Sequence, residues 1–144
     1  MLSNIDIHLS IGAPISRVWR LLTHPASMHR WMVDDGAEMD IISNWKTGSP
    51  IVFRGNLHGL SYETKGTILR LEPKAVLEYN YWSSLSQQAD VPENYSVITF
   101  QLAASEGDTL LTFNHRDIPE GTIYQHFRFY WRGALGGLKN MAEN

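Results

Sequence analysis

TIYQHFRFYWRGALGGLKNMAEN, residues 122–144, is the stretch that decides the fold of this chain. Its apolar side chains recur at a helical spacing, which predicts an amphipathic helix over residues 122–141. The apolar face, with Leu135 at its edge, consists of Ile123, Phe127, Tyr130, Trp131, Ala134, Leu138 and Met141. Such a helix is about 30 Å long, enough to cross a small domain. The rest of the chain must therefore supply a surface that covers this face.

Three glycines interrupt the same stretch, at Gly133, Gly136 and Gly137. Each costs about 1 kcal/mol relative to alanine in a helix interior, so tertiary packing must hold the helix together. On a helical projection, Gly133 and Gly137 share one flank of the apolar face, while Gly136 points toward Phe129 at the back. We expect the first two to allow close approach of the sheet or a ligand. We expect Gly136 to mark a kink or a contact point.

Upstream, alternating apolar and polar residues predict β-strands, and the turn residues between them are typical of an antiparallel sheet. The first strand covers residues 4–11, and two short helices follow, one from Pro14 to before Pro25 and one over Ser27–Met32. Six more strands are predicted at residues 37–43, 50–55, 60–71, 75–82, 95–103 and 108–115. The predicted fold class is α+β, with one antiparallel sheet and its helices on one face.

One connection, Ser83–Asn94, is longer than the others and polar. A loop of this length in a compact domain is typical of a lid or a contact surface. A loop with no role is equally compatible with the sequence.

Strand alternation also assigns the face of the sheet that meets the long helix. This face carries aromatic side chains, several of them with a polar tip, together with Gly66, which leaves space for a ligand. We call them the inner aromatic surface: Tyr62, Tyr79, Tyr81, Phe100, Phe113, His115, Phe127, Tyr130 and Trp131. A cavity between sheet and helix and an ordinary aromatic core both fit this pattern.

Composition excludes several classes of protein. At 144 residues the chain fits one domain, residues 1–144, and its formal charge of −3 without a basic run argues against nucleic-acid binding. The absence of cysteine excludes disulfides and thiolate chemistry and suits the cytoplasm. No apolar run approaches the roughly 20 residues of a membrane span, and the N-terminus lacks the features of a signal peptide.

Motifs for metal binding and catalysis are weak. His24 and His29, followed by Asp34-Asp35, lack the spacing of a metal site, so we predict no metal and no cofactor. His115 lies on the inner face, where it either contacts a ligand or is a hydrogen-bonded core histidine. No nucleophile or orienting partner accompanies it, and no nucleotide-binding or hydrolase motif is present. We therefore predict no catalytic residue.

A set of ordered motifs covers nearly the whole chain. It comprises Ala13-Pro14, Val18-Trp19, Leu22-Thr23, Pro25 and Trp31; Gly66-Thr67-Ile68, Glu72-Pro73, Leu77 and Tyr79; Pro92-Glu93-Asn94-Tyr95 and Thr99-Phe100; Thr109, Leu111, Phe113 and His115; and Trp131, Leu135 and Leu138-Lys139. This pattern resembles the START-like (SRPBCC, helix-grip) superfamily. Within it, the chain is most similar to bacterial proteins related to the C-terminal domain of the activator of Hsp90 ATPase.

The resemblance implies a curved antiparallel sheet, in the order β-α-α-β6-α, wrapped around a long C-terminal helix with a cavity between them. It also implies a cytoplasmic protein linked to the stress response. We expect a small, mostly apolar ligand in that cavity. The expected ligand-binding residues are Trp31, Tyr62, Tyr79, Tyr81, Phe100, Phe113, His115, Phe127 and Trp131.

Two other functions stay open at this point, because related folds differ in activity. One is a protein-interaction or chaperone-accessory module, favoured by the 83–94 loop and by Phe129 on the polar back of the helix, which also suits a homodimer. The eukaryotic Hsp90 activator has a separate N-terminal domain that nothing in this sequence matches. The other is a cyclase- or hydratase-type enzyme that uses His115 and a cavity tyrosine.

Overall fold

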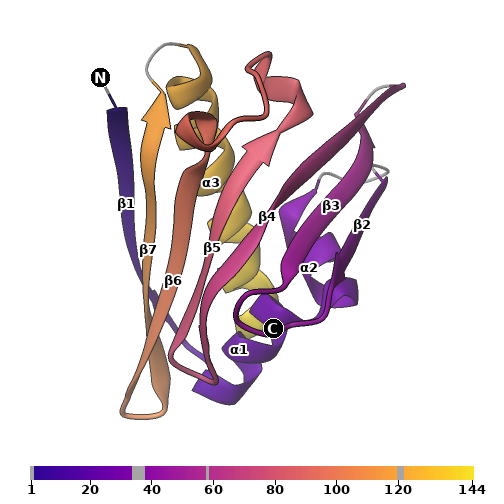
Figure 1. The fold of residues 1–144 in the computed structure, drawn as a ribbon. Coiled ribbons are helices and arrows are strands. Elements are labelled where there is room, and N and C mark those ends of the chain that lie inside the picture. The colour runs from indigo at the N-terminus through magenta and orange to yellow at the C-terminus, as the bar shows by residue number, and fades with distance from the viewer. Residues whose placement is uncertain (1, 34–37, 58, 120–121) are drawn as a thin grey trace.

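A computed structural model describes residues 2–33, 38–57, 59–119 and 122–144. The strands are β1 (Leu2–Ile11), β2 (Glu38–Ser43), β3 (Pro50–Leu57), β4 (Leu60–Glu72), β5 (Val76–Ser83), β6 (Ser96–Ser105) and β7 (Asp108–Pro119). The α-helices are α1 (Ile15–Thr23), α2 (Pro25–Met32) and α3 (Thr122–Glu143), and two short 3₁₀ helices, η1 (Ser84–Ser86) and η2 (Pro92–Asn94), lie between β5 and β6. This order confirms the predicted fold class and each predicted element (Figure 1).

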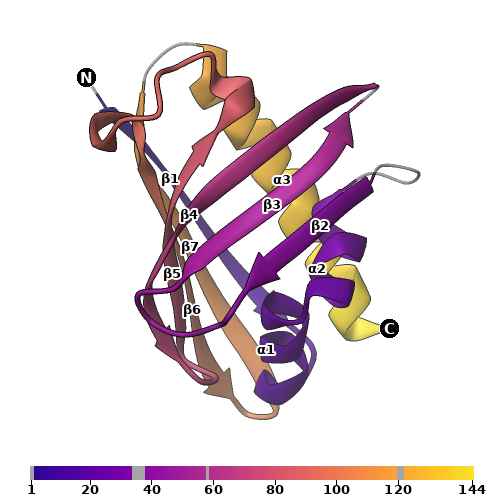
Figure 2. The same ribbon diagram turned by 45° about the vertical axis from the view of Figure 1, so that its right-hand side comes forward.

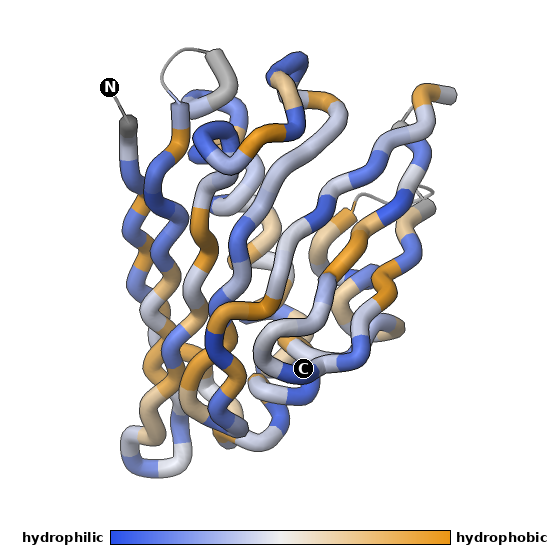
Figure 3. The backbone as a smooth tube through the Cα atoms, viewed as in Figure 1, coloured by the Kyte–Doolittle hydropathy of each residue, from blue (hydrophilic) through white to orange (hydrophobic). Residues whose placement is uncertain are grey.

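Within the described residues, the strands form one antiparallel sheet in the order β1-β7-β6-β5-β4-β3-β2. The sheet is strongly curved, and α3 crosses its concave face together with α1 and α2 (Figure 2). Hydropathy changes from residue to residue along the strands, as expected for a sheet with one wet and one buried face (Figure 3). The structure is therefore the helix-grip arrangement that the resemblance implies.

The apolar face of α3 holds the helix against the sheet. Trp131, Leu135 and Leu138 are almost completely buried, whereas the side chain of Ile123 lies outside the described residues. Hydrogen bonds tie both halves of the helix down: the Tyr130 hydroxyl donates to the Met32 carbonyl at 2.6 Å, and Lys139 Nζ donates to the Ser10 carbonyl at 2.6 Å. Packing and these bonds together offset the low helix propensity of the three glycines.

The glycines themselves do not act as expected. A Cβ built on Gly133 or Gly136 meets no atom within 4 Å, so neither glycine is needed for close approach inside the protein. At Gly137 a Cβ reaches the Trp31 carbonyl oxygen only at an ordinary 3.7 Å. The prediction that Gly133 and Gly137 allow close approach of the sheet is therefore wrong. Gly133 lies on the exposed side of α3, and the atom nearest to a Cβ at Gly137 belongs to α2.

Gly66 also has a different role from the predicted one. A Cβ at this position would collide with the Asn80 carbonyl of the neighbouring strand β5, and the Asn80 side chain accepts a hydrogen bond from the Thr67 amide at 2.6 Å. Gly66 thus permits close contact between β4 and β5. It does not leave space for a ligand.

The connection between β5 and β6 folds back onto the outer face of the sheet. Asp90 pairs with Lys65 at 2.6 Å and accepts a hydrogen bond from the Tyr95 hydroxyl at 2.6 Å. The Trp82 indole donates to the Gln88 carbonyl at 3.2 Å. Because Lys65 and Trp82 lie on the outer face, this loop does not cover the inner aromatic surface.

Membrane insertion through a helix finds no support in the described part of the chain. None of its helices combines the length and the apolar character that crossing a bilayer requires.

Candidate functional site

The structure places the nine predicted ligand-binding residues in two environments. Seven are buried: Trp31, Tyr79, Phe100, Phe113, His115, Phe127 and Trp131. The other two, Tyr62 and Tyr81, are only half-buried. The inner aromatic surface therefore has a packed end and an open end, and the two ends differ in what they can do.

The packed end consists of Trp31, Phe100, Phe113, His115 and Trp131. The rings of Phe113 and Trp131 lie 4.5 Å apart between centroids, and those of Phe100 and Phe113 lie 5.1 Å apart. Trp31, which comes from α2 and not from the sheet, meets Phe100 edge-on at 6.4 Å and donates its indole N–H to the Leu21 carbonyl. At this level, side chains fill the space between the sheet and α3, as in an ordinary close-packed core.

A chain of hydrogen bonds crosses the packed end and fixes the tautomer of His115. The Trp131 indole N–H donates to His115 Nδ1 at 3.0 Å, so Nδ1 carries no proton. The proton is therefore on Nε2, which lies 2.7 Å from Ser96 Oγ and donates to it. Ser96 Oγ donates in turn to the Tyr81 carbonyl at 3.4 Å. This chain links α3 to three neighbouring strands.

His115 is completely inaccessible to solvent, and burial lowers its pKa from 6.5 to about 3. It is therefore neutral at physiological pH. Both of its ring nitrogens already have partners, so no position is left for a substrate proton. This geometry favours the core-histidine interpretation of His115 over an acid or base.

The open end consists of Tyr62, Thr64 and Tyr81, bounded by Phe127. Tyr81 meets Phe127 edge-on at 5.6 Å and His115 edge-on at 5.6 Å, and Thr64 is buried. Burial raises the pKa of Tyr81 to about 12 and also raises the pKa of Tyr62. Most of the Tyr81 side chain is thus removed from water, and a part of it remains exposed. Such a position suits a group that contacts a bound molecule.

The open end lies where several elements begin or end. Tyr62 lies near the start of β4, Tyr81 near the end of β5 and Phe127 in the second turn of α3.

Sequence reasoning missed three residues of this surface. Ser96 shares the alternation of Ile98 and Phe100, so the same pattern predicts that it faces inward. Phe53 packs against Tyr79 at 5.9 Å, and it shares one face of its strand with the buried Ile51, two residues before it. Thr64 lies two residues after Tyr62 on the same strand, so alternation predicts that it too faces inward, and it is buried.

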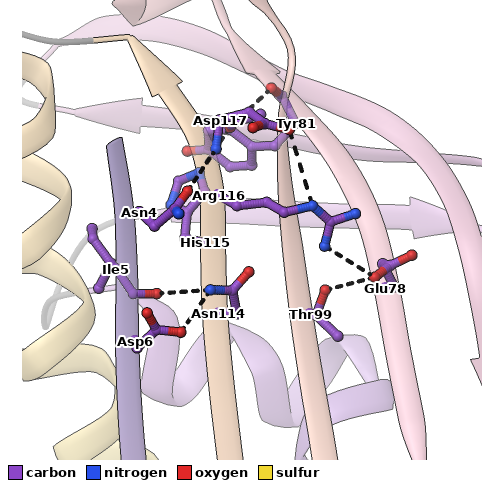
Figure 4. Close-up of polar contacts among 11 residues, drawn as sticks. Asn4, Ile5, Asp6, Glu78, Tyr81, Thr99, Asn114, His115, Arg116 and Asp117 are labelled. Carbon is purple, nitrogen blue, oxygen red and sulfur yellow. Dashed lines mark hydrogen bonds and ion pairs between the residues drawn. The ribbon is translucent and has the colours of Figure 1, made fainter. Parts of the chain in front are cut away.

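Polar residues on the outer face pair with one another. Arg116 reaches from β7 toward Glu78 on β5, at 3.5 Å, and Thr99 Oγ1 donates to the same carboxylate at 2.7 Å (Figure 4). Nearby, Asn114 Nδ2 donates to Asp6 at 2.7 Å. These contacts join β1 to β7, β6 to β5, and β7 to β5 across β6. They present no nucleophile and base within reach of each other.

No group of three or more potential metal ligands comes together among the described residues. Asp34 and Asp35, considered with His24 and His29 as ligands, lie outside the described residues.

Two hollows stand out on the surface of the described part, and neither is lined by residues of the inner aromatic surface. One, of about 440 Å³, is on the outer face beneath the β5–β6 connection, lined by Lys65, Gly66, Thr67, Asn80, Asp90, Pro92 and Tyr95. The other, of about 280 Å³, lies between β1 and α3. In the first hollow, Asp90 is paired with both Lys65 and Tyr95. This hollow is therefore the space that remains where the β5–β6 connection is fixed to the sheet.

Comparison with known proteins gives a consistent family. The family model described as "Activator of Hsp90 ATPase homolog 1-like protein" matches residues 12–143. No curated protein sequence matches the chain.

Solved structures share the fold over nearly the full length. A Cytophaga hutchinsonii protein solved in solution is 32% identical, with a TM-score of 0.82, and covers 99% of this chain and 94% of that one. A Chromobacterium violaceum protein is 19% identical, with a TM-score of 0.83 and 99% of each chain covered. The Aha1 dimer from Colwellia psychrerythraea is 22% identical, with a TM-score of 0.76, covering 98% of this chain and 96% of that one.

Proposed function

This chain belongs to the family of activator of Hsp90 ATPase homolog 1-like proteins, and on that premise we propose that it binds a small, mostly apolar molecule at the open end of the inner aromatic surface. The observation that carries the proposal is Tyr81, which stays half-buried while its ring packs edge-on against Phe127 and His115. The family and the fold support a binding module in general; the position and the ligand class are our inference.

The chemistry of the open end defines the ligand class. Phe127 supplies an apolar wall, and the rings of Tyr62 and Tyr81 supply further apolar area with polar tips. Thr64 is buried between these rings and the next strand, where its Oγ1 donates to Ser83 Oγ at 3.1 Å. A flat, apolar molecule with one hydroxyl or carbonyl group fits this combination best.

The packed end limits how deep the ligand can lie. His115 and Trp131 are hydrogen-bonded to each other and almost completely buried, so entry beyond them requires breaking a satisfied buried pair. The ligand therefore contacts Tyr62, Thr64, Tyr81 and Phe127, and the deeper predicted residues support these from behind. We further propose that residues 1–144 act as one cytoplasmic domain in this role.

Two measurements test the proposal. Native mass spectrometry of protein purified without organic solvent should detect a bound small molecule. Titration with 2-naphthol, an aromatic bicycle with one hydroxyl, should quench the fluorescence of the native protein at saturating binding. The variant Tyr81→Phe should bind 2-naphthol about tenfold more weakly, because a buried hydrogen-bond partner is lost.

Tyr95→Phe is the matched control, because Tyr95 bonds to Asp90 on the outer face and should leave binding unchanged. If no molecule co-purifies and 2-naphthol binds native protein and Tyr81→Phe alike, the proposal is wrong.

A second function, a protein-interaction or chaperone-accessory module, is favoured by Phe129. This side chain is 84% exposed on the back of α3, far more than any other large apolar side chain of the described residues. The structural relative from Colwellia psychrerythraea is described as a dimer, which makes self-association the first form to test. Light scattering over a range of protein concentrations should then show a dimer that Phe129→Ser dissociates. A monomer at every concentration contradicts self-association.

A further inference from the structure

The hollow between β1 and α3 has features that neither the fold nor the proposed function uses. Its volume is about 280 Å³, and its walls are the edge strand β1 and one side of α3. The lining residues are Asn4, Ile5, Asp6, Ile7, Tyr124, Arg128 and Arg132. Two arginines one helical turn apart therefore face the main chain of an edge strand.

Neither guanidinium is neutralised within the described part of the chain. The ion pairs recorded there involve other residues. Arg128 instead stacks on the Tyr124 ring, with its guanidinium carbon 5.9 Å from the ring centroid. The Tyr124 hydroxyl donates to the Asn4 carbonyl at 3.3 Å, so the ring that supports Arg128 is itself fixed. Arg128 is therefore held in position before any ligand arrives.

The free edge of β1 adds a main-chain donor. Alternate residues of an antiparallel strand direct their main-chain groups to the same side. The Ser10 carbonyl accepts from Lys139 on α3, so it points away from β7. Asp6 has the same parity as Ser10, and the Ile5 carbonyl, of opposite parity, accepts from Asn114 of β7 at 3.5 Å. The N–H of Asp6, a residue that lines the hollow, therefore points away from β7.

The Asp6 side chain does not cancel the two positive charges. Its carboxylate is turned toward the outer face, where it accepts from Asn114 Nδ2 at 2.7 Å (Figure 4). It forms no ion pair with either arginine in the described structure. The hollow thus combines two cations and one main-chain N–H, which is the donor set that oxyanions require.

We propose that this hollow binds an oxyanion, the phosphate or carboxylate group of a small molecule, between Arg128, Arg132 and the main-chain amide of Asp6. Planar guanidinium groups bind both kinds of group with two hydrogen bonds. The site is separate from the open end of the inner aromatic surface, so it does not rest on the proposed function. Either proposal can fail without the other.

The test is an NMR titration of the ¹⁵N-labelled full chain with inorganic phosphate and, separately, with acetate, both at constant ionic strength. Saturable shifts should be confined to the amides of residues 4–8 and to the Arg128 and Arg132 side chains. Saturation by phosphate alone identifies a phosphate site, and saturation by acetate a carboxylate site. The double variant Arg128→Gln/Arg132→Gln should weaken binding about tenfold or more, since two hydrogen bonds to a charged group are lost.

Arg20→Gln/Arg30→Gln is the matched control, because it removes the same charge from exposed positions on α1 and α2. It should leave the affinity unchanged. If the first double variant does not fold, Arg132→Gln alone replaces it, since Arg132 is exposed. The proposal is overturned if neither anion gives saturable shifts, or if both double variants weaken binding equally.

Discussion

The two ends of the inner aromatic surface are built from similar residues but differ in how far neighbouring side chains bury them. At the packed end, the polar atoms of Trp131 and His115 satisfy each other, and the rings around them leave no accessible surface. At the open end, Tyr62 and Tyr81 remain half-buried although burial raises the pKa of both. An inward-facing aromatic residue therefore contributes to stability where neighbouring side chains bury it and satisfy its polar atoms. Where they do not, it can contact a bound molecule.

Truncating the packed end should have the largest effect. Trp131→Ala removes a buried indole and leaves His115 Nδ1 without its donor, so it should lower the free energy of unfolding by about 3–5 kcal/mol. Urea denaturation followed by circular dichroism measures this change. Trp82→Ala, a half-buried tryptophan of the outer face, should cost clearly less. Equal losses for both variants would show that the packed end is not the stable core of the protein.

Acidification should weaken the packed end next. The unfolded chain binds a proton at His115 near pH 6.5, whereas the folded chain excludes it until about pH 3. Stability from this group is therefore complete above about pH 7 and falls by about 1.4 kcal/mol per pH unit below 6.5, or about 2 kcal/mol by pH 5.

His115→Gln removes this titration while keeping a side chain that can both accept from Trp131 and donate to Ser96. The difference in unfolding free energy between the native chain and the variant, measured from pH 7.5 to 5, should shrink toward lower pH. A constant difference would mean that His115 is accessible to protons in the folded state.

Changes at the open end should affect stability less and binding more. Tyr81→Phe keeps the ring against Phe127 and removes one hydroxyl of a half-buried residue, so it should change the unfolding free energy by no more than about 1 kcal/mol. Thermal and urea unfolding of this variant, beside Trp131→Ala, gives the comparison directly. A loss as large as that of Trp131→Ala would remove the distinction between the two ends.

The smallest effect should come from the exposed side of α3. Gly136→Ala and Gly133→Ala should each stabilise the protein by about 0.5–1 kcal/mol, because alanine favours the helix and meets no neighbouring atom. Gly66→Ala should do the opposite, since its Cβ would strike the Asn80 carbonyl. Urea unfolding measures all three. Destabilisation by either helix substitution would indicate that this side of α3 is covered in solution.

Much of the fold could be predicted from the sequence, because its signals are local. Strand alternation and turn residues located each strand, and the helical period located α3. Alternation also placed Phe113 and His115 on the buried face. The roles of Gly66 and Gly133 could not be predicted in this way, because each depends on which atoms of another element lie opposite.

The division of the inner aromatic surface was likewise out of reach of the sequence. Alternation assigns a face to a side chain, but it does not tell whether α2 fills the space beside it, as Trp31 does for Phe100. The partners of His115 come from residues 19 positions upstream and 16 positions downstream, so no local pattern reports them. Only the tertiary arrangement separates a completed core from a surface that can accept a molecule.

The central claim is that a small molecule binds at the open end and not among the packed rings. The most direct test is to measure nuclear Overhauser contacts between 2-naphthol and selectively labelled protein. Contacts with the Thr64 methyl group and the Tyr81 ring, and none with Phe100 or Phe113, are the predicted result. Contacts with Phe100 and Phe113, or none with any of these residues at saturating 2-naphthol, would contradict the account.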